Sequence, residues 1–163
     1  VICTCELAQW LQKRKLKTHP LGSGGGNNFP FGRVDATLAF HGCGGDPLPD
    51  GSVPPPNTPI GFLINWGKGK VIYHAGDTAL FSDMKLIGEK QKIDVALLPI
   101  GDNFTMGTDD ALKALEFLNA PLCIPMHYNT FDIIKTDALA FAFHLEKRGR
   151  HCKVLKPGEK IDL

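Results

Sequence analysis

Three residues that could bind a metal ion each follow a predicted β-strand. They are His41 after residues 34–40, Asp77 after residues 70–73, and His127 after residues 122–125. Layered α/β proteins place their sites where strands end, so we expect these side chains to meet at one sheet edge. Two imidazoles and a carboxylate suit Zn²⁺, Mn²⁺ or Fe²⁺ better than Ca²⁺. A single histidine after a strand is more often a hydrogen-bonded structural residue, so the threefold repetition is what favours a metal site.

The residues around Asp77 fit the same chemistry. Ala75 and Gly76 are small and let the backbone turn tightly before the carboxylate. Thr78 can hydrogen-bond and hold the turn in place. His74 precedes the turn, and three roles stay open for it: an accessory ligand, a residue that supports a ligand, or a packing residue.

Strands and helices alternate along most of the chain, which predicts an α/β layered fold. Period-two and apolar segments predict strands, and a Gly/Pro-rich stretch at 42–59 predicts a long loop of the kind that often binds ligands. The predicted strands are 34–40, a hairpin of 60–65 and 70–73 around Trp66-Gly67-Lys68-Gly69, then 95–99, 122–125, 153–155 and 161–163. The predicted helices are 6–15, 108–119 with Thr108 as N-cap, and 137–148. Residues 22–28 do not match the dinucleotide-binding fingerprint, because Asn27 stands where its third glycine belongs. We predict that they form a flexible loop.

Composition excludes several classes of function. The net charge of +1 gives no electrostatic case for binding nucleic acid or an anionic membrane. No apolar run approaches the length of a membrane span. Five scattered cysteines make a poor disulfide framework, which favours the reducing cytoplasm. We expect a cytoplasmic protein that acts on a small-molecule substrate.

Several motifs together resemble the metallo-β-lactamase superfamily. They are Phe29-Pro30-Phe31-Gly32, Ala39-Phe40-His41, His74-Ala75-Gly76-Asp77-Thr78, Leu98–Gly107 and Pro125-Met126-His127-Tyr128-Asn129-Thr130. More narrowly, the chain is similar to metal-dependent hydrolases related to the ascorbate-6-phosphate lactonase and phospholipase D-like branches. The resemblance covers essentially the whole chain. It implies the αββα sandwich of that superfamily.

The resemblance also implies roles for residues. His41 would bind a first metal ion, His127 a second, and Asp77 would bridge the two and be essential for catalysis. The ions would be Zn²⁺ by preference, with Mn²⁺ or Fe²⁺ as alternatives. A hydroxide held between them would attack an ester, amide, lactone or phosphoester. Asn103 and Asn129 are expected in the substrate pocket, and His74 and Thr78 beside the metal ligands.

One motif of the superfamily is absent from the 163 residues. The His-x-His-x-Asp-His motif normally lies upstream of the segment that corresponds to Val1. We therefore interpret residues 1–163 as the C-terminal two-thirds of a single domain, completed by an N-terminal segment or a neighbouring chain, and inactive alone. The alternative is a noncatalytic metal-binding or scaffold domain. A nuclease is a third possibility, which the near-neutral charge disfavours.

Overall fold

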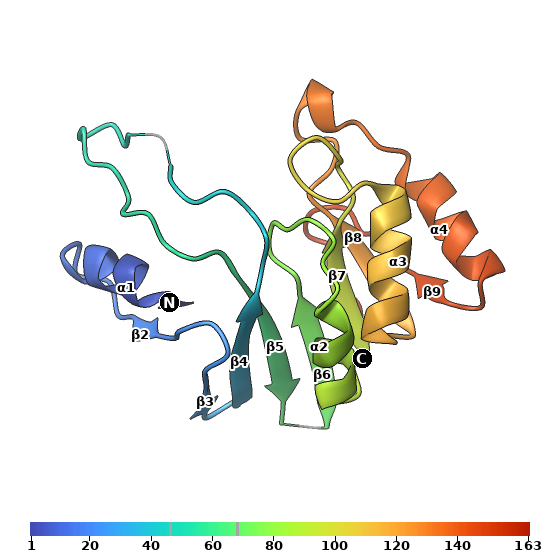
Figure 1. Ribbon diagram of the computed structural model, residues 1–163, viewed down its shortest axis with the longest axis horizontal. Coiled ribbons are helices and arrows are strands. Elements are labelled where there is room, and N and C mark those ends of the chain that lie inside the picture. Colours follow the sequence, from blue (N-terminus) through green and yellow to red (C-terminus); the bar gives the residue numbers. More distant parts are fainter. Residues whose placement is uncertain (46, 68) are drawn as a thin grey trace.

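The computed structural model describes residues 1–45, 47–67 and 69–163. Its main feature in these residues is a seven-stranded sheet with the order β3-β4-β5-β6-β7-β8-β9 (Figure 1). The strands are β3 (Gly26–Phe29), β4 (Gly32–Leu38), β5 (Ile60–Trp66), β6 (Lys70–His74), β7 (Val95–Pro99), β8 (Leu122–Met126) and β9 (His151–Cys152). Strands β3 to β6 pair antiparallel, and β6 to β9 pair parallel. The expected α/β class is confirmed.

Helices connect the parallel strands, as parallel pairing requires. They are α2 (Met84–Lys90), α3 (Thr108–Leu118) and α4 (Ala138–Lys147), and a 3₁₀ turn, η1 (Asp132–Ile134), precedes α4. A smaller unit at the N-terminus contains β1 (Ile2–Cys3), α1 (Cys5–Gln12) and β2 (His19–Pro20), with β1 and β2 paired in parallel. No helix in the described ranges is long and apolar enough to cross a membrane.

The main core lies between the sheet and its helices. Alternate strand residues such as Leu63, Tyr73 and Leu98 are almost fully buried, and they cluster with Leu115 of α3 and Phe141 of α4. Figure 1 shows α2 and α3 in front of β6, β7 and β8. The helices α2, α3 and α4 therefore all cover the same face of the sheet.

The opposite face of the sheet is apolar but only half-buried. The residues that alternate with the core positions are Phe62, Ile64, Ile72, Leu97 and Ile124, and each keeps partial exposure. Register places Ile64 opposite Ile72, Leu97 opposite Ile124, and His74 between Phe62 and Leu97, so one histidine interrupts the apolar residues. We call this side of the sheet the open face. A second cluster, with Leu21 packed on Val34 and Ala36, covers it over β4 and reaches Phe62 and Ile64 of β5.

The sequence-based strands at 34–40, 60–65, 70–73, 95–99 and 122–125 are confirmed with end shifts of a few residues. The helices predicted at 6–15, 108–119 and 137–148 appear as α1, α3 and α4, but Gly107, and not Thr108, is the N-cap of α3. The turn predicted at 66–69 includes Lys68, which lies outside the described residues.

Three predictions about regular structure were wrong, namely the strands at 153–155 and 161–163 and the loop at 22–28, and one helix was not predicted at all. No strand forms at 153–155 or 161–163 in the described chain; the last strand is β9, next to α4. Residues 26–28 belong to β3 and are not a free loop, because their backbone pairs with β4. The helix α2 was missed because it has only seven residues and contains Gly88.

Candidate metal site

Asp77 and His127 meet at one edge of the sheet. Asp77 follows β6 and His127 follows β8, and both strands run parallel to β7, which lies between them. The ends of these strands therefore emerge at the same edge. His127 Nε2 lies 3.5 Å from Asp77 Oδ2, with a quarter of the histidine side chain and half of the aspartate side chain exposed.

Left-handed backbone conformations accompany both residues of the pair, directly before Asp77 and at His127 itself. Gly76 has φ of 67° directly before Asp77, and a Cβ there would lie 2.8 Å from the Ile60 carbonyl oxygen. His127 itself has φ of 54°, a conformation that non-glycine residues adopt rarely. Strained backbone of this kind gathers at functional sites, where the surrounding structure maintains it.

Thr78 ties the Asp77 turn to two other segments. Its fully buried hydroxyl accepts a hydrogen bond of 2.9 Å from the Phe40 amide. Its carbonyl accepts one of 3.1 Å from the Met106 amide, and the Ala79 amide donates to the Phe40 carbonyl at 2.8 Å. These three hydrogen bonds hold the ends of three segments that leave the sheet to each other around Thr78.

His74 supports the turn from inside. Gly76 N–H donates to His74 Nδ1 at 3.1 Å, so the Nδ1 atom accepts and the neutral ring carries its proton on Nε2. Burial lowers the pKa of His74, and the nearby Asp77 carboxylate opposes that shift. A neutral His74 keeps the tight turn closed without adding positive charge beside Asp77.

The structure does not gather all three expected ligands. No group of three or more His, Cys, Asp or Glu side chains placed to hold a metal occurs within residues 1–45, 47–67 and 69–163. His41 is exposed, and its ring Nδ1 is hydrogen-bonded at 3.0 Å to the carbonyl of the next residue, Gly42. His41 has already left β4, which ends at Leu38, and no strand pairing fixes its position. The expectation that His41 joins Asp77 and His127 is therefore not met in this conformation.

The donor atoms that are present nevertheless fit a metal ion. His127 Nδ1 is buried and has no hydrogen-bond partner in the described structure, so the ring is not held as a structural histidine. In His41, Nδ1 carries the proton when it donates to the Gly42 carbonyl. The Nε2 atom of His41 then keeps a free lone pair that can bind a metal ion. Carboxylate oxygen and imidazole nitrogen are ligands that Zn²⁺, Mn²⁺ and Fe²⁺ accept.

The expected pocket residues Asn103 and Asn129 are in loops next to this edge. Asn103 is exposed with φ of 45°, and Asn129 is exposed with φ of 59°. The Asn129 side chain accepts a hydrogen bond of 2.8 Å from the Thr136 amide, so it shapes its own loop. Neither residue lines either of the two cavities found in the described chain.

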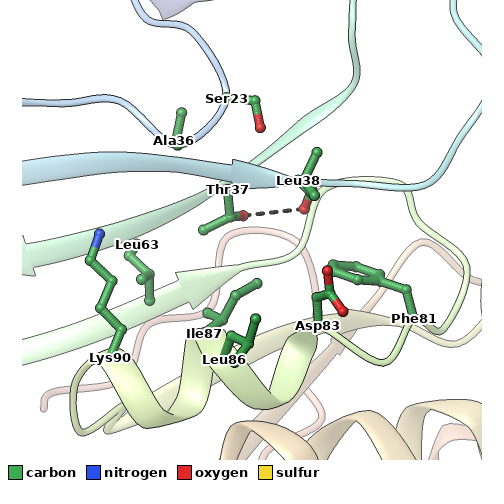
Figure 2. A pocket seen from close by; sticks show the side chains of 11 residues that line it. Ser23, Ala36, Thr37, Leu38, Leu63, Phe81, Asp83, Leu86, Ile87 and Lys90 are labelled. Atoms are coloured by element: carbon green, nitrogen blue, oxygen red, sulfur yellow. Dashed lines mark hydrogen bonds between the residues drawn. The ribbon is translucent and has the colours of Figure 1, made fainter.

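A cavity of about 490 Å³ lies elsewhere, between β4 and α2. Figure 2 shows Leu63, Leu86 and Ile87 on its floor, with Phe81 and Asp83 at one end and Lys90 at the other. No pattern in the sequence indicated this cavity, because α2 was not predicted. The ring of Phe81, which lines the cavity, lies 5.4 Å from the ring of Phe40 in a tilted contact.

A mixed sheet with helices on one face and a carboxylate–imidazole pair at its strand ends is the arrangement expected of the metallo-β-lactamase class. Residues 2–128 match the family described as the beta-lactamase superfamily domain, and the chain belongs to that family. The expected superfamily is thereby confirmed.

Relatives of this chain are named metal-dependent hydrolases. It is 51% identical over 164 residues to a UPF0173 metal-dependent hydrolase of Geobacillus sp. strain WCH70, and 47% identical over 165 residues to one of Bacillus cereus strain B4264. All of the chain and 70% of each relative are covered. Among solved structures, Igni18, a metallo hydrolase from Ignicoccus hospitalis, matches with a TM-score of 0.82 and 34% identity. That match covers 98% of this chain and 66% of Igni18.

Proposed function

We propose that the chain is part of a metal-dependent hydrolase that cleaves an ester, lactone, amide or phosphoester bond. The observation that carries the proposal is the Asp77–His127 pair, 3.5 Å apart at the edge where β6 and β8 end. The names of the relatives support the same activity. The five free cysteines support a cytoplasmic location.

The residues of the chain have separate tasks in this proposal. His41, Asp77 and His127 would hold two divalent ions, Zn²⁺ by preference, with Mn²⁺ or Fe²⁺ as alternatives. When bound, the ions would activate water and stabilise the negative charge that develops on the substrate. Thr78 and His74 position Asp77, since one bonds the Phe40 amide and the other the Gly76 amide. The remaining ligands would come from the upstream motif that the resemblance implies.

Removing the metal tests the activity. We expect dialysis of the complete protein against a chelator to lower hydrolysis of model esters at least about 10³-fold, because metal ions contribute several kcal/mol at the reacting oxygen. Readdition of Zn²⁺, Mn²⁺ or Fe²⁺ should restore it, with metal content measured by plasma mass spectrometry. Bound metal without turnover of any ester, lactone, amide or phosphoester would favour the noncatalytic scaffold. Turnover that survives complete metal loss would contradict the proposal.

We further propose that residues 1–163 form the C-terminal two-thirds of one domain, and that another layer covers the open face. That layer would come from a preceding segment or a neighbouring chain. The open face supports this, because Ile72, Leu97 and Ile124 stay half-exposed beyond the part that the N-terminal cluster covers, and sandwich folds bury apolar positions of this kind.

Dye binding measures whether the open face is covered. We expect the 163-residue chain to enhance the fluorescence of an anilinonaphthalene dye. Co-expression with the part of the Geobacillus relative that this chain does not cover should suppress the signal. Leu97→Asp should reduce dye binding to the chain alone. Leu139→Asp, at a site 72% exposed on α4, is the matched control and should not. Equal dye binding with and without the added segment would argue against a covering layer.

A further inference from the structure

We infer that the substrate is uncharged at the group to be cleaved and carries an apolar portion, which Phe104, Phe131 and Ile133 contact. The inference rests on the proposed hydrolytic function and narrows its substrate class. Among the proposed substrates, we therefore expect neutral esters, lactones and amides and not phosphoesters.

The three apolar residues lie on two loops beside Asp77 and His127. Residues 100–107 leave β7, and residues 127–136 leave β8; Figure 1 shows the two loops together beyond these strand ends. The Thr136 hydroxyl donates to the Ile100 carbonyl at 3.1 Å, which joins one loop to the other. The Met106 amide donates to the Thr78 carbonyl at 3.1 Å, which joins the first loop to the Asp77 turn. The loops and the metal site are therefore one connected structure.

Each loop has a buried apolar residue, which anchors it, and an exposed apolar tip. Met106 and Ile134 are fully buried, whereas Phe104 is 54% exposed and Phe131 and Ile133 are each 62% exposed. The exposed tips gain little from folding, because their apolar area stays in water. An exposed apolar group next to a reaction site is where a ligand can bury its own apolar area.

Left-handed turns shape the loops that present these tips. Asp102, Asn103 and Asn129 all have positive φ, at 58°, 45° and 59°. Asn and Asp adopt this conformation more readily than other non-glycine residues, so the sequence itself favours these turns.

Positive charge is missing from the segments around the site. The chain has 18 lysine and arginine residues, yet none lies in residues 41–59, 74–83, 100–107 or 126–134. Arg14, which follows the end of α1 and reaches residues 50 and 52, is paired with Asp50, and Lys135 is paired with Asp132. Proteins that bind phosphate usually supply Arg or Lys donors. These segments supply aspartates instead.

Helix N-termini could replace basic side chains as anion sites, but both near the loops are already compensated. Helix α3 carries Asp109 and Asp110 in its first turn. Helix α4 has Asp137 as its N-cap, and that carboxylate accepts from the amides of Leu139 and Ala140. A phosphate would meet negative charge at either helix.

Ester hydrolysis by the complete, metal-loaded protein tests this inference. We expect kcat/KM to rise at least about tenfold from p-nitrophenyl acetate to the octanoate, since each buried methylene contributes about 0.8 kcal/mol, and bis-p-nitrophenyl phosphate to be the poorer substrate. Phe104→Ser and Phe131→Ser should each lower the octanoate-to-acetate ratio several-fold. Phe143→Ser, at a site 54% exposed on α4, is the control and should leave the ratio unchanged.

Binding of the neutral probe N-phenyl-1-naphthylamine separates this inference from the proposed function. Turnover of esters without a chain-length effect, or a preference for the phosphodiester, would overturn the inference and leave the hydrolase standing. If nothing is hydrolysed but both serine variants bind the probe several-fold more weakly than Phe143→Ser, the apolar site stands and the hydrolase fails. Unchanged probe binding in both variants would overturn the inference in either case.

Discussion

Asp77→Ala should lower hydrolysis by the complete protein at least about 10³-fold and reduce its metal content. The carboxylate is placed 3.5 Å from His127 and is the proposed bridge between two ions, so its loss removes several kcal/mol of stabilisation. Asp77 is exposed, and substitution of an exposed residue changes folding stability by only about 0.5 kcal/mol. Kinetics and metal analysis on the same preparation measure both effects.

Asp83→Ala is the matched control for this prediction. Asp83 is an exposed aspartate six residues further along the same segment, and its side chain accepts only from the Ser82 hydroxyl among described contacts. We expect its metal content and turnover to equal those of the unaltered protein. If Asp77→Ala retains full metal and rate, Asp77 does not belong to the site.

His127→Ala should remove one metal ion and nearly all hydrolysis, whereas His74→Ala should keep both ions. The His74 imidazole acts on the Gly76 amide and not on the reacting atoms, so its loss should slow the reaction only about 10–100-fold. Alanine at position 127 also meets the left-handed backbone, which costs about 1 kcal/mol of stability. His127→Asn avoids most of that cost, because asparagine tolerates this conformation.

Metal stoichiometry, kcat and urea denaturation distinguish these effects. The two substitutions at 127 should lose metal equally and differ only in stability. His144→Ala, at an exposed position on α4, is the control and should change none of the three quantities. Loss of a metal ion from His74→Ala, with full retention in both variants at 127, would reverse the two assignments.

The sheet and part of the site could be predicted because their signals are local. Short apolar strands such as Val95–Pro99 and Leu122–Met126 are bounded by Gly, Pro or polar residues, and ligand-type residues follow them directly. Parallel pairing then brings Asp77 and His127 together without further information. The sequence also indicated the tight turn at Ala75 and Gly76.

The missed features depend on contacts between distant residues. Helix α2 contains Gly88 because α3 packs so closely that a Cβ there would lie 2.8 Å from Leu118 Cα. Glycine has a low intrinsic helix propensity, so the sequence alone argues against a helix at this position. The place of His41 depends on the segment 42–59, whose Gly and Pro residues carry no periodic pattern from which a position could be deduced.

The lengths of the edge strands limit how this chain can assemble with another. Strand β9 has two residues and β3 has four, compared with seven in β4 and β5. Growth by strand addition needs a long row of unpaired backbone groups, which these edges lack. A covering layer must instead stack face to face, about 10 Å away, through interdigitated side chains. Such an assembly would be held by apolar burial and would therefore loosen on cooling.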